Sequence, residues 1–454
     1  IYSGGTGTIS TMSGGLQGII SGGAGTVSTM NGGLQLVENG GSGIVSTLSG
    51  GTQMIVDQGS GTIGTMSGGL QEISSGGMGT VSTLNGGSQM ISSGGTGTVD
   101  IMSGGNQTIS SGGNGSIGAL NDGVQKISGG TGTITKLNNG VQNIASGGTG
   151  TVVTMISGMQ NIASGGTGTV STVSGGLQYI ESSGIGTISS LLGGTQAVNS
   201  GGTALDTVIA GGTQMVSSGA VVSGATLSAG VQQVYDGNGL HDITFAGGTQ
   251  AVMSGATVSG MQVANGVQSI SSGGTAINTE ISAGGSLQLS SGGIVSDLTL
   301  TSGSLELENI NGGSFTVSGT LTANNAVINM VDSSVTRAGT PAYETLTIDK
   351  LTGSGTTFIM DTDLAGETNS DKIIITDADV GTHYVQIKDL SKLNNIEVTG
   401  EHKQLLITDT SGKLTFEGKE FNAGGLWDVD PTLAKGDTLG LSSCLLYTSP
   451  SPRD

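Results

Sequence analysis

The sequence predicts an all-β fold, a parallel β-helix (β-solenoid) with about 18 residues in each coil. Three observations support this prediction. Glycine supplies 89 of the 454 residues, which disfavours helices because a glycine inside a helix costs about 1 kcal/mol relative to alanine. Short β-prone runs alternate with Gly-Gly pairs that mark turns. A single glutamine recurs at a nearly constant spacing, and such a period is typical of stacked repeats.

The spacing of the glutamines defines the repeat. The residue number rises by 18 from each glutamine to the next, except for one step of 17 between Gln125 and Gln142. We expect one turn, at residues 128–130, to be a residue shorter while the strands stay in register. Seventeen units fit between Ser3 and Glu308. The recurring glutamines are Gln17, Gln35, Gln53, Gln71, Gln89, Gln107, Gln125, Gln142, Gln160, Gln178, Gln196, Gln214, Gln232, Gln250 and Gln268.

Three aliphatic columns run through the repeats. The first follows each glutamine by two positions and is always Ile or Val, as Ile109 follows Gln107. The other two columns, represented by Val27 and Met30, are three residues apart. A straight strand would point these two to opposite faces, so we expect a bend between them. Stacking equivalent coils lets each strand pair with its copies, which a single unit cannot do.

Each glutamine has the same strand parity as the aliphatic residue two positions later, so both are expected to point inward. One interpretation of the glutamine column is a polar stripe that binds a ligand. The favoured interpretation is a structural ladder of amides that satisfy one another inside the solenoid and fix the register of the coils.

The composition disfavours several functions. A net charge of −20 argues against nucleic acid as a partner, because phosphate binding needs a basic surface. The single cysteine, Cys444, gives no disulfide and no cysteine metal site. The sequence contains no run of 18 apolar residues, so it predicts no membrane helix. The histidines His241, His383 and His402 are scattered. We therefore expect no catalytic set, no metal and no cofactor.

The chain is expected to contain three segments. Residues 1–308 form the regular solenoid, and residues 309–443, with the only tryptophan, Trp427, form a less regular solenoid end that caps it. Residues 444–454 break with everything before them and match the translation of a sequencing adapter, so we interpret them as an artefact. Since the sequence opens within a repeat, we expect it to be a fragment of a longer protein.

Two stretches resemble known autotransporters. Residues 201–216, with the pattern Gly-Gly-Thr-Ala-x-x-Thr-Val-x-x-Gly-Gly-Thr-Gln-x-Val, resemble the AIDA-type repeat of bacterial autotransporter adhesins. Residues 346–355, 358–364, 370–372 and 425–429 resemble the pertactin-like autochaperone stem of the same secretion class. The resemblance implies a right-handed parallel β-helix, exported through an outer-membrane β-barrel that this sequence lacks. It also implies a location at the bacterial cell surface, anchored in the outer membrane or secreted.

The expected function is that of a surface adhesin without enzymatic activity. Repeated weak contacts would give avidity, and the partner would be a second copy of the chain or a host or abiotic surface. The main alternative is the stalk of an autotransporter enzyme whose catalytic domain lies upstream. A minor alternative is adsorption to ice or a crystalline surface through the recurring Thr-Gly-Thr, although Met78 and Ile185 are among the residues that interrupt this column.

Overall fold

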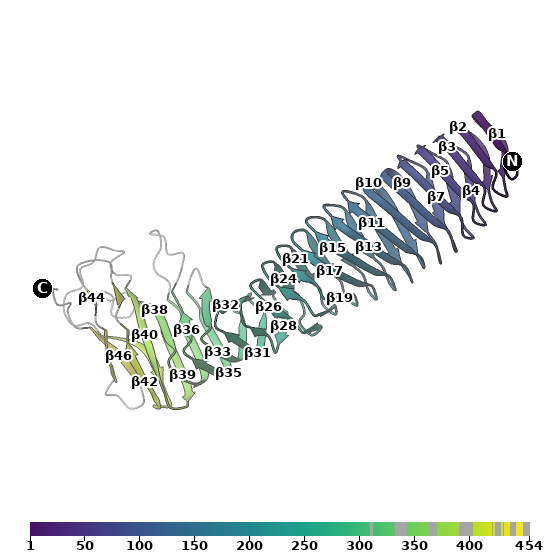
Figure 1. The fold of residues 1–454 in the computed structure, drawn as a ribbon. Helices are drawn as coiled ribbons and strands as arrows, with labels where there is room; N and C mark the ends of the chain where they lie inside the picture. Colours follow the sequence, from purple (N-terminus) through teal and green to yellow (C-terminus); the bar gives the residue numbers. More distant parts are fainter. Residues whose placement is uncertain are drawn as a thin grey trace. The chain divides into compact units, whose positions relative to one another are not determined.

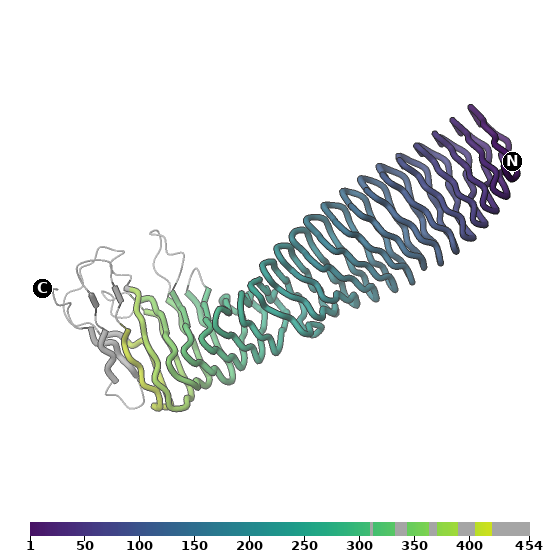
Figure 2. The backbone as a smooth tube through the Cα atoms, in the orientation of Figure 1, coloured from purple at the N-terminus to yellow at the C-terminus, as the bar shows by residue number. Residues whose placement is uncertain are grey.

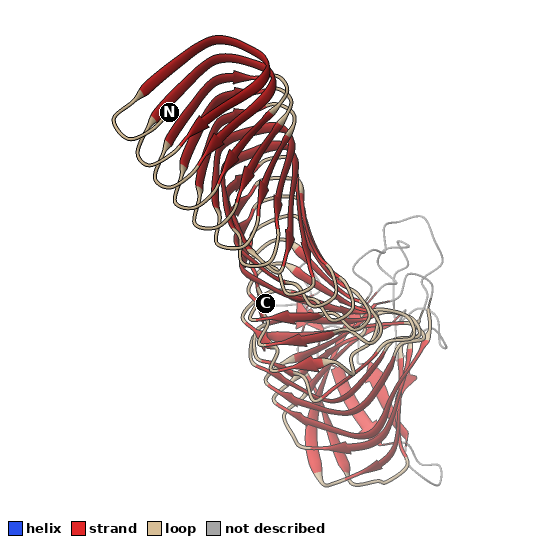
Figure 3. Cartoon of the chain, turned by 90° about the vertical axis from the view of Figure 1, so that its right-hand side faces the viewer, coloured by secondary structure: helices blue, strands red, loops and turns tan. Residues whose placement is uncertain are grey.

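The computed structural model describes residues 1–308, 312–331, 343–362, 370–389 and 403–419, and the backbone of four short strands after them. Within this described part the secondary structure consists of strands, bridges and turns, without a helix (Figure 3). The chain divides into two compact units, Ile1–Thr226 and Leu227–Asp454, whose strands are labelled in Figure 1. Each unit is described by itself below.

The strands that begin in the first unit are β1 (Thr6–Ile19), β2 (Ala24–Val37), β3 (Ser42–Leu48), β4 (Thr52–Ile55), β5 (Ser60–Met66), β6 (Leu70–Ile73), β7 (Met78–Leu84), β8 (Ser88–Ile91), β9 (Thr96–Ile109), β10 (Asn114–Ser128), β11 (Thr131–Leu137), β12 (Val141–Ala145), β13 (Thr149–Met155), β14 (Met159–Ile162), β15 (Thr167–Val173), β16 (Leu177–Ile180), β17 (Ile185–Leu191), β18 (Thr195–Val198), β19 (Thr203–Leu205), β20 (Val208–Ile209), β21 (Thr213–Val216), β22 (Val221–Ser223) and β23 (Thr226–Leu227).

The strands of the second unit are β24 (Val231–Val234), β25 (Leu240–His241), β26 (Thr244–Phe245), β27 (Thr249–Val252), β28 (Thr257–Ser259), β29 (Gln262–Val263), β30 (Gly266–Ile270), β31 (Thr275–Ser282), β32 (Gly285–Ser290), β33 (Ile294–Thr301), β34 (Ser304–Glu308), β35 (Ser314–Asn324), β36 (Val327–Asn329), β37 (Thr345–Thr352), β38 (Thr357–Thr362), β39 (Lys372–Ala378), β40 (Gly381–Asp389), β41 (Lys403–Asp409), β42 (Leu414–Gly418), β43 (Phe421–Asn422), β44 (Asp428–Val429), β45 (Pro431–Lys435) and β46 (Ser442–Tyr447).

A coil of the first unit contains a longer and a shorter strand, separated by glycine turns. β5 and β6 form one coil, and they pair in parallel with β7 and β8 of the next, so that Ile63 lies beside Val81 and Gln71 beside Gln89. Figure 2 shows successive turns of the backbone lying side by side in this unit. The predicted parallel β-solenoid is confirmed, and its paired positions in successive coils repeat with the period of the glutamines.

The bend expected between two aliphatic columns is present. In β3, burial alternates as far as Val45, and then the exposed Ser46 and half-buried Thr47 separate it from the buried Leu48. Ser46 also has no partner where β3 pairs with β5. Because the alternation changes phase at this serine, two residues three positions apart can both point into the core.

The shorter step is absorbed by a turn. Ile127 pairs with Ile144 and Gln125 with Gln142, so the shorter strands keep their register. The longer strands take the same reduced step, since Asn114 pairs with Thr131. Five positions separate Ile109 from Asn114, but only four separate Ile127 from Thr131. The missing residue therefore falls in the turn at residues 128–130, as predicted.

The second unit continues parallel pairing with a different core. Gln250 pairs with Gln268, but Gln268 pairs with Leu287, where the glutamine column ends. Further along the same sheet Phe358 lies beside Val385. A second parallel sheet runs through β31, β33, β35, β37, β39 and β41. Larger apolar side chains thus replace the glutamine amides in the core.

The C-terminal predictions are only partly covered. His402 lies outside the described residues, and so do residues 363–364 and 425–427 of the resemblance, which include Trp427. Cys444 lies in the antiparallel backbone strand β46, which pairs with β41 and β45. The division at residue 308 and the adapter origin of residues 444–454 stay predictions. No helix in the described part is long and apolar enough to cross a membrane.

Candidate functional site

The recurring glutamines form hydrogen-bonded columns inside each unit. From Gln35 to Gln214, each Nε2 donates to the Oε1 of the preceding glutamine, at 2.6–2.7 Å. In the second unit the amides of Gln250 and Gln268 donate in the same way, at 2.8 and 3.0 Å. Gln17 is 6% exposed and the others are fully buried. No solvent-borne ligand can therefore reach these amides along the outer surface.

The glycine of each Thr-Gly-Thr makes room for this column. A Cβ at Gly97 would lie 2.8 Å from Gln89 Oε1 and 2.4 Å from Ile91 Cδ1, and Gly132 is placed in the same way against Gln125. Both distances are too short for any side chain, because the glutamine and isoleucine already fill the space. The glycine and the glutamine of each repeat are therefore parts of one packing arrangement.

Two buried threonines complete the glutamine columns. Thr207 Oγ1 donates to Gln196 Oε1 at 3.0 Å, and Thr279 Oγ1 donates to Gln268 Oε1 at 3.4 Å. The second bond satisfies the last glutamine, whose neighbour in the next coil is a leucine. The sequence analysis missed both threonines. Each follows its glutamine by 11 residues, and this spacing is a signal that could have identified them.

The outward side chains of the first unit form two chemically different faces. The threonine face is one outward column of the longer strands, the residue directly before the inward Ile or Val: Thr8, Thr26, Ile44, Thr62, Thr80, Thr98, Ser116, Thr133, Thr151, Thr169 and Thr187. The leucine–methionine face comprises the residues directly before and after each glutamine from Gln17 to Gln178: Leu16, Gly18, Leu34, Leu36, Thr52, Met54, Leu70, Glu72, Ser88, Met90, Asn106, Thr108, Val124, Lys126, Val141, Asn143, Met159, Asn161, Leu177 and Tyr179.

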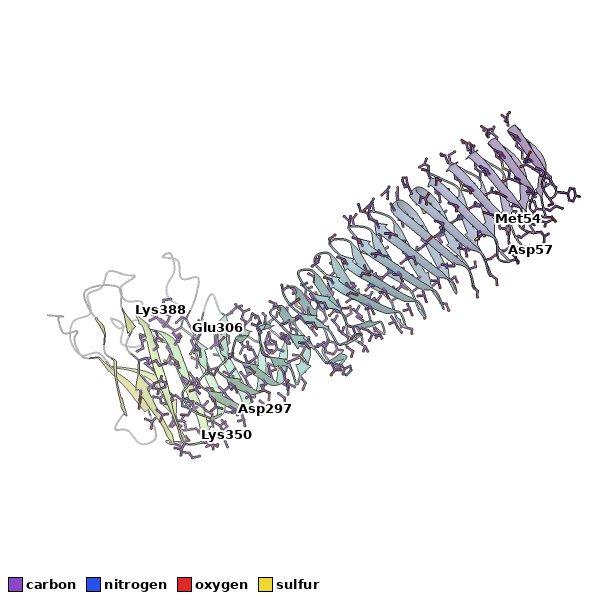
Figure 4. All side chains as sticks on the ribbon, viewed as in Figure 1. Met54, Asp57, Asp297, Glu306, Lys350 and Lys388 are labelled. Carbon is purple, nitrogen blue, oxygen red and sulfur yellow. The ribbon has the colours of Figure 1, made fainter. Side chains whose placement is uncertain are left out.

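The leucine–methionine face is nearly free of charge. All its side chains are half-buried or exposed, and Figure 4 labels Met54 among them. Glu72 and Lys126 are its only charged residues, and both directly follow a glutamine. Parallel pairing places equivalent residues of successive coils about 4.8 Å apart. The face is therefore a band of Leu, Met and Val side chains mixed with Gly, Ser, Thr, Asn and Tyr, and it carries two isolated, opposite charges.

A buried carboxylate joins two segments of the second unit. Asp371 accepts hydrogen bonds from the backbone N–H of Glu344 at 2.9 Å and of Asp361 at 2.6 Å. Burial raises the pKa of Asp371 to about 7, although the hydrogen bonds with Glu344 and Asp361 oppose the shift. Because its folded pKa exceeds the unfolded value, the stability linked to this carboxyl is present at acid pH and is lost as the pH rises from about 4 to about 7.

A buried histidine lies in the same unit. His383 packs between Phe358 and Phe416, with ring centroids 6.0 Å from each, and its two ring nitrogens have no hydrogen-bond partner. Burial lowers the pKa of His383 to about 4. Its contribution to stability is therefore present above pH 6.5 and is lost as the pH falls toward about 4, which opposes the contribution of Asp371.

The two histidines that the structure describes lie in different surroundings. His241 is exposed in β25, whereas His383 lies in an aromatic cluster of the core. Among the residues that the structure describes, no group of three His, Cys, Asp or Glu side chains could hold a metal ion.

Comparison with known proteins gives one family match and two structural likenesses. Residues 318–430 match the family model of pertactin. The hyper-glycosylated TibA55-350 fragment is 28% identical, covers 67% of this chain and 98% of its own, and has a TM-score of 0.40. The Haemophilus influenzae Hap adhesin is 14% identical, covers 94% of this chain and 64% of its own, and has a TM-score of 0.36. No curated protein matches the sequence.

The pertactin match covers the segment in which the sequence resembles an autochaperone stem, and that resemblance is confirmed. It includes β37 to β42, whose parallel strands continue the solenoid of the second unit. The match covers about a quarter of the chain, and it shows that this C-terminal segment is similar to pertactin.

Proposed function

We propose that this chain is an autotransporter passenger, displayed at the cell surface or secreted, and that it acts as an adhesin that attaches or clumps cells through many weak contacts, above all between two copies of the chain. The observation that supports the proposal most is the repetition of the outward positions. Each coil of the first unit presents the same two faces at a fixed spacing, so one contact recurs along the solenoid. Many such contacts bind through avidity, because each further contact forms within an existing encounter.

The surface chemistry favours contact with another protein or an uncharged surface. Residues 1–226 carry seven acidic and two basic side chains, so long-range attraction to a charged partner is weak. The first unit has no carboxylate pattern of the Gly-Gly-x-Gly-x-Asp type that binds calcium in repeat toxins. We therefore propose an adhesion that does not depend on calcium and involves no enzymatic reaction.

The experiment that tests this function varies the number of coils. Beads carry residues 1–441, or variants from which whole repeat units of the first unit have been deleted, and clumping is measured with and without a chelator. We expect clumping to fall gradually as units are removed and to be unchanged by the chelator. Complete loss on chelation would contradict the calcium-independent mechanism. Absence of clumping and attachment by the undeleted chain would favour the stalk of an enzyme.

Adsorption to a crystalline surface is a second proposal. It is supported by the threonine face, in which nine of the eleven outward residues are threonine. A second outward column contains the residues two positions before those of the threonine face. It is less regular, because Ala24, Met78, Asn114 and Ile185 interrupt its threonines. Replacing Thr80 and Thr98 by lysine separates the two proposals, since it should abolish adsorption to a crystalline surface and leave clumping between beads intact.

A further inference from the structure

We infer that Met261 is a site of oxidation by peroxides in the folded protein, and that the Gln250 amide binds the oxygen of the resulting sulfoxide. Met261 belongs to the core of the second unit. Oxidation of a core methionine ordinarily disrupts packing, because it turns an apolar side chain into a polar one. At this position the added oxygen has a hydrogen-bond donor beside it. This modification is independent of the proposed adhesion.

The Met261 sulfur already contacts this donor. Gln250 Nε2 donates one hydrogen bond to Gln232 Oε1 at 2.8 Å and one to Met261 Sδ at 3.7 Å. A thioether sulfur is only a weak acceptor, so the second N–H of this buried amide is poorly satisfied. An oxygen bonded to the sulfur is a stronger acceptor and can lie closer to Nε2, at the usual N–H···O distance of about 2.9 Å.

Other coils hold an oxygen at the place that Met261 occupies. Met261 follows Gln250 by 11 residues, and Thr279 follows Gln268 by the same number. β29 and β31 pair in parallel, so these two residues are equivalent in successive coils. The Thr279 hydroxyl, like that of Thr207 in the first unit, donates to a glutamine oxygen. A sulfoxide would instead accept from the glutamine nitrogen, and since an amide offers both groups, the column can satisfy either.

The surface beside Met261 is open. Gly260 directly precedes it with a φ of 70°, and a Cβ on this glycine would have no atom within 4 Å. The equivalent residues of the neighbouring coils are Asp242 and Asn278, which do carry side chains. Met261 is 8% exposed, whereas the other buried methionines that the structure describes are 4% exposed or less. We therefore expect a peroxide to reach this side chain without unfolding of the coil.

The reaction transfers one oxygen atom from hydrogen peroxide to the sulfur. The sulfur lone pair attacks one oxygen of the peroxide, and the O–O bond breaks. The hydroxide that leaves takes the proton from the transferred oxygen and departs as water. The sulfur is oxidised by two electrons and the peroxide is reduced by two. The product is a sulfoxide whose oxygen can accept the second N–H of Gln250.

The first test measures where hydrogen peroxide oxidises the purified full chain under native conditions. Peptide mass spectrometry follows each added oxygen over time, and the exposed Met78 shows that the oxidant is active. Met330 and Met360 are fully buried controls in the same unit. Met261 should gain oxygen at least about tenfold faster than these two, because they react only when the structure opens locally. Equal protection of all three would overturn the inference.

The second test shows whether the amide holds the oxygen. A sulfoxide has two epimers, and each is reduced by a different methionine sulfoxide reductase. Peptides from the oxidised chain are treated with one reductase or the other. Because Gln250 Nε2 lies on one side of the sulfur, one epimer should predominate at Met261, so one enzyme should remove nearly all of its oxygen. At Met78 each enzyme should remove about half. Equal epimers at Met261 would contradict the bond to Gln250.

Stability distinguishes this site from ordinary oxidative damage. Met261→Leu keeps the surface methionines but lacks the site, so oxidising both chains isolates the effect of one sulfoxide. Oxidation should lower the urea midpoint of the unsubstituted chain no more than that of Met261→Leu, because an N–H···O bond replaces the weaker sulfur contact. A larger fall in the chain that keeps Met261 would refute a sulfoxide held by the amide. Circular dichroism checks that both chains are folded before oxidation.

Discussion

The interior glutamine column makes a strong prediction at Gln107. Its Nε2 donates to Gln89 Oε1 at 2.7 Å, and its Oε1 accepts from Gln125 Nε2 at 2.6 Å. Gln107→Leu keeps the approximate volume but removes both of these bonds and the longer one from Nε2 to the Ser116 carbonyl oxygen, at 3.4 Å. It leaves one acceptor and one donor unpaired in side chains that are fully buried. Each buried unpaired group costs about 1–3 kcal/mol, so we expect a loss of about 2–6 kcal/mol, offset in small part by the apolar side chain.

The same substitution at the end of the column provides the control. Gln17 is joined only to Gln35 among its neighbouring glutamines and is 6% exposed, so Gln17→Leu should cost about half as much. Urea unfolding followed by circular dichroism measures both variants. Hydrogen exchange in residues 96–127 shows whether the loss is local, because repeat proteins can open one coil at a time. Equal stability of the two variants would refute a cooperative amide column.

Four further outcomes are expected. Ile109→Asp should lower stability by several kcal/mol, because it buries an unpaired carboxylate in a fully buried position; an unchanged urea midpoint would contradict this. Inserting one serine after Ser128 restores the regular step in a turn and should change the melting temperature little, whereas the same insertion after Gln125 should unfold the coil. Thr279→Val should lower the free energy of unfolding by about 1–3 kcal/mol, because it leaves Gln268 Oε1 without its donor. Urea unfolding measures the loss, with Thr275→Val as the control variant. Between pH 4 and 6.5 the contributions of Asp371 and His383 oppose one another, so the stability of the unmodified chain should depend little on pH in this range. Asp371→Asn should instead lose about 1.4 kcal/mol of unfolding free energy for each pH unit of acidification, which urea unfolding measures; a pH-independent stability of this variant would be evidence against the His383 shift.

The sequence alone predicted the solenoid, its period and most of its core. This was possible because each coil repeats the same chemistry. The same pair, a glutamine and an Ile or Val two positions later, occurs fifteen times. A single such pair would not identify a buried strand, but its regular repetition does. The bend between Val27 and Met30 and the short turn at residues 128–130 followed from counting residues against strand parity.

Other features depended on contacts between residues that no repeat relates. Thr207 and Thr279 each follow a residue with positive φ, Asp206 (48°) and Asn278 (51°), and each bonds to a glutamine 11 residues earlier in the chain. The opposite pKa shifts of Asp371 and His383 arise from burial in the irregular second unit, where no period indicates which polar residue lies inside. In the sequence, the residues of the two outward faces are seen only as polar or apolar residues that alternate with the core residues of each strand. Only the stacking of strands joins them into surfaces, because equivalent residues of successive repeats then lie about 4.8 Å apart in space.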